Sequence, residues 1–178
     1  MDIQYVLLNP KGRIASRDFL RGLVLLTGAF MIVQVIGTFV LPALTVLVYP
    51  LIYPYVCVFS KRLHDAGQSG WLYLLFLLGY AIIGSIASAL LMPALSPAAY
   101  EMNLEFQQAL QGGGMAGVFS EMTDHADELG RKSALTTLVS FLFTSALLGF
   151  IGARLPSDPD NNRHGPPTSR QSPSNTFS

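Results

Sequence analysis

Long apolar stretches separated by short polar segments dominate the pattern along this chain. The run from 22 to 60 has no charged residue over 39 positions, and Gln34 is its only amide side chain. A helix rises about 1.5 Å per residue and a bilayer core is about 30 Å thick, so one span needs about 20 residues. The run is too long for a cleaved signal peptide or a single span, and it predicts two helices with a tight turn near Gly37 and Pro42.

The same pattern predicts an all-α fold, an integral membrane bundle of four transmembrane helices within one domain over residues 1–167. Helix is expected because backbone N–H and C=O groups in hydrocarbon must be paired within their own segment. The spans are expected at about 19–40, 42–61, 71–92 and 133–153. The third should end before Pro93, and the external segment 93–132 should form two short helices separated by the glycines at 112–114. Residues 168–178 are rich in Ser and Pro and are expected to be disordered.

Basic residues are concentrated on one side of this arrangement. Nine of the eleven Lys and Arg residues lie before the first span, between the second and third, or after the fourth, and four spans place these segments together. Only Arg131 and Lys132 would lie on the other side. The positive-inside rule then predicts that both termini are cytoplasmic.

Composition limits the chemistry. The formal net charge is zero, so we expect no nucleic-acid partner. Cys57 is the single cysteine, which excludes an internal disulfide and a cysteine metal site. Asp124, His125 and Glu128 lie within one turn and could hold a divalent cation, but exposed polar residues at this spacing usually face water. We therefore expect no metal and no cofactor.

Small residues at four-residue spacing predict where the spanning helices approach one another. The third span has Ala81, Ser85 and Ala89 at this spacing, and the fourth has Ser145 and Gly149. Such residues allow close contact between helices that lipid tails do not force together. We expect packing within the chain, and self-association into a homo-oligomer through one stripe is the alternative.

Three polar segments on the predicted cytoplasmic side supply a candidate polar cap or headgroup-binding site. In 9–22, arginines recur every four residues, which is typical of a helix anchored to anionic headgroups, and Ser16 could cap that helix. In 61–71, an arginine could bind a phosphate bidentately, a serine could cap the third span and a tryptophan suits the headgroup level. The candidate residues are Arg13, Arg17, Arg62, His64, Asp65, Ser69, Trp71, Asn162 and Gly165.

Two interpretations of these residues remain open. In the first they form a structural latch, with Asp65 pairing an arginine of the first segment. In the second, Arg62 and its neighbours bind a headgroup or another ligand. A catalytic role for His64 and Asp65 would need a nucleophile or an oxyanion donor beside them, and the sequence shows neither.

Three motifs in order resemble a known family. They are GRIASR at 12–17, RLHDAGQSGW at 62–71 and NNRHGPP at 161–167, and the middle one is the most specific. The arrangement resembles the bacterial inner-membrane family catalogued as domain of unknown function 805, over about residues 5–167. It departs from the family pattern in the spacing of the first arginines and in a longer external segment. The resemblance implies the fold, the orientation and the location, and it implies no activity.

Two functional hypotheses follow. The leading one is a non-enzymatic membrane protein that binds or senses at the cytoplasmic membrane surface, with anionic lipid headgroups as the simplest ligand. The alternative is a small transporter or channel component. The charge-free spans argue against that alternative, because ion and proton pathways usually contain intramembrane charges.

Overall fold

The computed structural model describes residues 2–168, with the side chains of 109–118 and 121 excepted. The predicted disorder of the tail therefore concerns residues that, apart from Thr168, lie outside the described part. The described chain is helical and contains no strand. The elements in chain order are α1 Ile3–Leu8, α2 Ser16–Phe39, the 3-10 helix η1 Pro42–Leu47, α3 Val48–Asp65, the 3-10 helix η2 Gly70–Leu72, α4 Tyr73–Leu95, α5 Pro97–Asp124 and α6 Ala126–Arg154.

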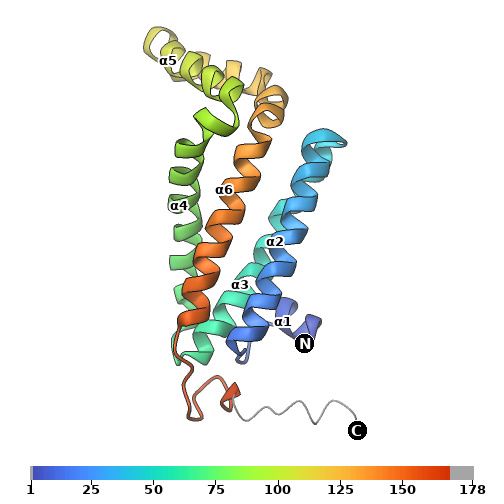
Figure 1. Ribbon diagram of the computed structural model, residues 1–178, viewed down its shortest axis with the longest axis vertical. Helices are drawn as coiled ribbons and strands as arrows, with labels where there is room; N and C mark the ends of the chain where they lie inside the picture. The colour runs from blue at the N-terminus through green and yellow to red at the C-terminus, as the bar shows by residue number, and fades with distance from the viewer. Residues whose placement is uncertain (1, 169–178) are drawn as a thin grey trace.

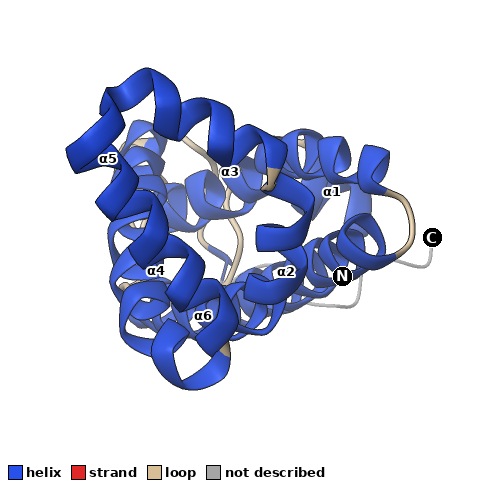
Figure 2. Ribbon diagram, turned by 90° about the horizontal axis from the view of Figure 1, so that it is seen from above, coloured by secondary structure: helices blue, strands red, loops and turns tan. Residues whose placement is uncertain are grey.

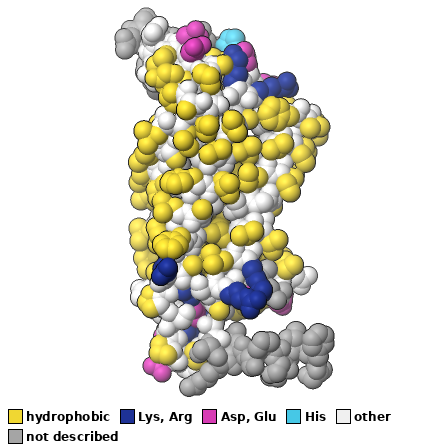
Figure 3. All heavy atoms as spheres, viewed as in Figure 1, with side chains coloured by type: hydrophobic (Ala, Val, Ile, Leu, Met, Phe, Trp, Pro, Cys, Tyr) yellow, Lys and Arg dark blue, Asp and Glu magenta, His cyan; other side chains and the backbone are white. Residues whose placement is uncertain are grey.

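Four helical segments are long and apolar enough to cross a membrane. They are α2, η1 with α3, η2 with α4, and α6, and their most apolar windows have mean hydropathies between 1.7 and 2.3. On the face shown in Figure 3, hydrophobic side chains cover the middle of the molecule, and charged side chains gather toward its two ends. Such an apolar band is the surface that hydrocarbon requires. The fold is an integral membrane bundle of four helices.

Helix α6 holds the bundle together. It packs against α4 on one side and α2 on the other, while α3 packs mainly on α2 and α1 (Figure 2). Helix α1 and the segment after α6 lie at the same end of the bundle, and α5 crosses the opposite end (Figure 1). An even number of spans brings the N-terminal and C-terminal segments to the same side.

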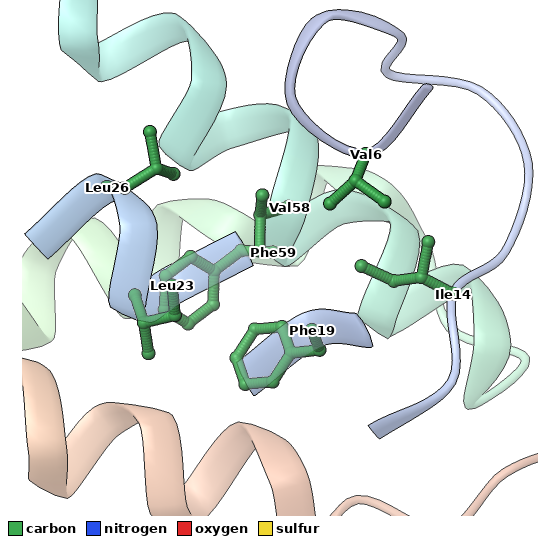
Figure 4. Close-up of a cluster of buried hydrophobic side chains, with 7 residues drawn as sticks. All are labelled: Val6, Ile14, Phe19, Leu23, Leu26, Val58 and Phe59. Atoms are coloured by element: carbon green, nitrogen blue, oxygen red, sulfur yellow. The ribbon is translucent and has the colours of Figure 1, made fainter. Parts of the chain in front are cut away.

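An apolar core lies where α1, α2 and α3 meet, close to the end that carries both terminal segments. Phe19 of α2 and Phe59 of α3 pack edge to face with ring centroids 5.2 Å apart. Both rings are buried, and Leu23 lies against them (Figure 4). The remaining members are Val6, Ile14, Leu26 and Val58. This core fixes the positions of α1 and of the loop that leads into α2.

Helix bounds differ from the sequence-based expectations at several points, and α6 already begins at Ala126 rather than at 133. Helix α4 continues through Pro93 to Leu95, because a proline removes one helical hydrogen bond and spanning helices tolerate that loss. Helix α5 runs without a break through the glycines at 112–114, because glycine lowers helix propensity but keeps its N–H donor. Helix α3 extends to Asp65, beyond the predicted end at 61, because its last polar residues find partners inside the protein.

Burial along α4 does not follow the predicted small-residue stripe. Ala81, Ser85 and Ala89 are exposed, whereas Ala87 is buried. Ala81 and Ser85 nevertheless lie on the side of α4 that faces α6, because both line a hollow together with residues of α6. On α6, Ser145 and Gly149 are both buried. Small residues occur on several faces of α4, so their four-residue spacing does not show which of them is buried.

Candidate functional site

Arg62 caps the C-terminal end of α6 by donating hydrogen bonds to its carbonyl groups. Its Nε donates to the carbonyl oxygen of Gly152 at 3.0 Å, and its Nη2 donates to the carbonyls of Ala153 and Leu155. The last carbonyls of a helix have no partner within the helix and carry its negative dipole end. The guanidinium therefore joins the end of α3 to the end of α6, and only 2% of Arg62 is exposed.

Arg13 has the equivalent role for the chain after α6. Its Nη1 donates to the carbonyls of Asp160, at 2.9 Å, and Gly165, at 3.3 Å. Its Nη2 donates to the carbonyls of Asp65, at 3.2 Å, and Asp158. Arg13 is as deeply buried as Arg62, although it lies in a loop before α2. It holds the segment 155–168 against the bundle.

Asp65 forms ion pairs with both arginines. Its Oδ1 accepts from Arg13 Nε at 3.1 Å, and its Oδ2 accepts from Arg62 Nη1 at 2.5 Å. The hydroxyls of Ser157 and Thr168 donate to the same carboxylate at 2.6 and 2.9 Å. We call Arg13, Arg62 and Asp65, together with the segment 155–168 that they bind, the polar cap. The pairing of Asp65 with an arginine of the first segment is the contact that the latch hypothesis predicts.

Lys61 anchors α1 beside the polar cap, a role that the sequence interpretation missed. Its Nζ donates to the carbonyls of Tyr5 and Val6, the latter at 2.8 Å, and it lies 4.4 Å from the centre of the Tyr5 ring. A buried cation at the C-terminal end of a helix is stabilised by the helix dipole. The available signal was a lysine at the end of a long charge-free run.

His64 supports the turn before α2 and the turn after α6 at once. Its Nδ1 lies 3.0 Å from the carbonyl oxygen of Gly12, and its ring stacks on that of His164 with centroids 3.7 Å apart. Arg163 Nε lies 3.0 Å from His164 Nε2. Burial, followed by the nearby charges of His64, Arg163 and Arg13, lowers the pKa of His164 from its usual 6.5. Both imidazoles pack against the polar cap. His64 contacts Gly12 and His164 rather than pairing with Asp65.

Asn162 and Gly165 shape the returning chain. They form an isolated antiparallel bridge, and Gly165 has a φ of +128°, which favours glycine. Asn162 Nδ2 donates to the His64 carbonyl at 3.1 Å and to Asp158 Oδ2 at 2.9 Å. The hydrogen bond from Asn162 Nδ2 to Asp158, followed by one from the Asp160 N–H, lowers the pKa of Asp158. The structure thus brings Arg13, Arg62, His64, Asp65, Asn162 and Gly165 together.

The other predicted residues lie apart from this cluster. Arg17 is exposed on α2, because Arg13 precedes the helix and the two do not share its face. Trp71 is 73% exposed in η2, just before α4. Ser69 occupies the N-cap position of η2 but makes no capping hydrogen bond. Ser16 is the first residue of α2 rather than its cap, and its hydroxyl donates to the Ala153 carbonyl at 3.0 Å.

The geometry corrects the proposed role of Arg62 as a phosphate ligand. A guanidinium has five N–H donors, and Arg62 and Arg13 each make five donor contacts inside the protein. Binding a headgroup would require breaking contacts in the buried cap, which is costly because the released carbonyls would be left unpaired. Of the two interpretations, the contacts favour the latch.

The residues considered for a cation, at the opposite end, form an exposed cluster of charges. Glu128 accepts from Lys132 Nζ at 2.7 Å and lies 3.6 Å from His125 Nδ1, and about half of the Glu128 side chain is exposed. In the described part of the chain, no group of three His, Cys, Asp or Glu side chains is close enough to hold a metal ion.

Four apolar helices joined at one end by a buried arginine–aspartate cluster define a multi-pass membrane protein. A family model with the description "Protein of unknown function (DUF805)" matches residues 7–166. The chain belongs to this family. The match covers the motifs at 12–17, 62–71 and most of 161–167, whose residues meet in the polar cap. No curated protein and no solved structure matches the chain.

Proposed function

We propose that this is a non-enzymatic protein of the bacterial inner membrane that binds anionic lipid headgroups at its cytoplasmic surface. The polar cap is then the rigid base of the binding surface, and exposed cations around it are the ligands. Both termini face the cytoplasm in this proposal. The concentration of Lys and Arg in the segments at that end supports this orientation.

The observation that carries the proposal is the contrast between buried and exposed arginines. Arg13 and Arg62 are saturated by internal contacts, whereas Arg17 and Arg21 are exposed one turn apart at the start of α2. Arg21 contacts Asp18 only loosely, at 3.6 Å. Two exposed guanidiniums at the boundary of the apolar band suit phosphates of a lipid surface, and each basic residue there contributes about 1 kcal/mol.

The test compares two pairs of basic residues at opposite ends of the bundle. Detergent-purified protein is mixed with dioleoylphosphatidylglycerol, and retained lipid is measured by native mass spectrometry. We expect Arg17→Gln with Arg21→Gln to weaken retention by roughly thirtyfold, because about 2 kcal/mol is lost. The matched control, Arg131→Gln with Lys132→Gln, should retain the lipid like the unmodified chain. Equal retention by all three proteins would refute the proposal.

Orientation is tested separately. A fluorescent reporter that folds only in the cytoplasm is fused after Ser178, and alkaline phosphatase, which is active only outside, is fused there in a second chain. We expect fluorescence and no phosphatase activity. The opposite result would place the polar cap outside the cell and contradict the location of the proposed binding surface.

A further inference from the structure

A cavity of about 380 Å³ lies within the bundle, with α3 and α4 supplying most of its walls. Aromatic rings from all four spanning segments line it, among them Phe30 of α2, Tyr55 of α3, Tyr80 of α4 and Phe141 of α6. The volume falls within the range of roughly 300–1,000 Å³ that is typical of small-molecule sites. The space is therefore large enough for part of a lipid-sized ligand.

The cavity opens sideways through the wall of the bundle. Ile52 of α3 and Leu77 of α4 line it and are 46% and 48% exposed. Both residues lie in membrane-spanning segments, so the medium outside this opening is hydrocarbon. Molecules dissolved in the bilayer can reach the cavity directly, and such molecules need an apolar part to be there.

A second hollow, with hydroxyl groups on its walls, adjoins the first between α4 and α6. The two hollows share Tyr80, Ala81 and Phe141 as lining residues. Hydroxyl-bearing residues line the second one, including Ser140 and Thr144 of α6. One elongated molecule could therefore contact aromatic rings along one part of its length and hydroxyl groups along another.

The Ser140 hydroxyl indicates that such a molecule would have a polar group. Ser140 is 4% exposed, and its Oγ has no hydrogen-bond partner in the described part of the chain. A buried polar group without a partner costs roughly 1–3 kcal/mol, and surrounding hydrocarbon offers no compensation. An occupant with oxygen atoms would remove this cost.

The depth and charge of the site favour an occupant whose polar group is neutral. Ser140 lies roughly 20 Å along α6 from Arg154 at the polar cap, which places it near the middle of the bilayer. None of the described residues that line the two hollows carries a formal charge. A phosphate at this depth would need a cationic partner. The anionic lipids proposed for the surface therefore do not fit here.

We propose that the adjoining hollows bind one neutral glycerolipid of the diacylglycerol class, with an acyl chain between the aromatic rings and its uncharged glycerol and ester oxygens facing Ser140. This site is separate from the surface arginines in residues, depth and ligand charge.

The test uses the intact chain in detergent, with dioleoylglycerol as the probe and native mass spectrometry as the readout. Leu77→Trp should fill the opening and reduce dioleoylglycerol retention by about tenfold. Leu78→Trp is the matched control, because Leu78 is 54% exposed on the same helix and is not among the residues that line the cavity. It should bind the probe as the unmodified chain does.

Ser140→Ala tests the polar contact. It should reduce dioleoylglycerol retention about fivefold, the value of one hydrogen bond of about 1 kcal/mol, and raise lipid-free thermal stability slightly, because the unpartnered hydroxyl is removed. Retention that is unaffected by both Leu77→Trp and Ser140→Ala would overturn the proposal. So would dioleoylphosphatidylglycerol retention that Leu77→Trp reduces as strongly, since a charged head would then occupy the site. The Arg17→Gln, Arg21→Gln chain should keep dioleoylglycerol binding, so either proposal can fail alone.

Discussion

Arg13 and Asp65 are 52 positions apart in the sequence, and their side chains meet at 3.1 Å in the buried polar cap. The same carboxylate pairs with Arg62, one turn earlier on α3. Through these two arginines, one buried aspartate connects the segment before α2, the end of α3 and the chain after α6. Both arginines that hold the polar cap together are therefore paired with a single negative charge.

Replacing that charge should loosen the whole cap. Asp65→Asn keeps the side-chain shape but leaves two buried guanidiniums without a counter-charge. Removing one partner of a buried ion pair typically costs about 3–5 kcal/mol. We expect a lower unfolding temperature in detergent and faster tryptic cleavage after Arg163, which is exposed in the segment that the cap holds.

The control for this change is Asp18→Asn. Asp18 contacts Arg21 at 3.6 Å with both side chains substantially exposed, and such surface pairs contribute about 0–1 kcal/mol. Its unfolding temperature and cleavage rate should stay close to those of the unmodified chain. If Asp65→Asn behaved like Asp18→Asn, the cap would not be the structural latch described above.

Lys61→Met should release α1 and leave the spanning helices in place. The methionine keeps much of the apolar stem but cannot donate to the Tyr5 and Val6 carbonyls. We expect faster hydrogen exchange over residues 3–8, measured by mass spectrometry, with little change in α6. Lys11→Met, at an exposed position of the same segment, should change neither. Exchange that remained slow in Lys61→Met would show that the apolar contacts alone hold α1.

Gly152→Ala should destabilise the contact between α2 and α6. A Cβ atom at this position would lie 2.6 Å from Phe19 Cζ, and the Phe19 ring is fully buried and cannot move aside. Overpacking of this kind typically costs about 1–3 kcal/mol. Gly130→Ala meets open space on the same helix and should stabilise it by about 0.5–1 kcal/mol. Thermal unfolding should therefore move in opposite directions for the two variants.

The stability of the docked segment should fall with acid because of His164. The pKa of His164 is lowered in the fold, mainly by burial, from the value of 6.5 that it has in the unfolded chain. The folded protein therefore protonates His164 less readily than the unfolded chain does. The stability that neutral His164 contributes to the fold is complete above pH 6.5. It decreases as the pH falls from 6.5 to the pKa of His164 in the fold, and it is constant below that pKa. Cleavage after Arg163 by a protease active over this range should accelerate in the same window.

His164→Gln separates this effect from other titrations. Glutamine cannot gain a proton, so the part of the pH dependence that belongs to His164 should disappear while that of the stacked His64 remains. A pH profile identical in both proteins would show that His164 is not responsible.

The apolar pattern was sufficient to predict four spanning helices, because hydrocarbon forces every long charge-free run to satisfy its own backbone as a helix. The apolar pattern was less informative where alternative helix bounds or packed faces have similar energies. Glycines at 112–114 weaken a helix without breaking it, and Pro93 is accommodated within α4. Small residues around α4 likewise left its packed face undetermined, and the buried residue proved to be Ala87 rather than a member of the predicted stripe.

By itself the sequence determined the helical class, the even number of spans and the family, and it indicated that Asp65 would meet an arginine. Only the tertiary structure decided that Arg13 and Arg62 have no donor left for a phosphate, because their partners are mostly carbonyl oxygens that any residue could supply. The tertiary structure likewise decided that the Ser140 hydroxyl has no hydrogen-bond partner among the described residues and lies beside a hollow between α4 and α6. Periodicity shows which residues can face a neighbour, whereas packing decides which atoms they reach.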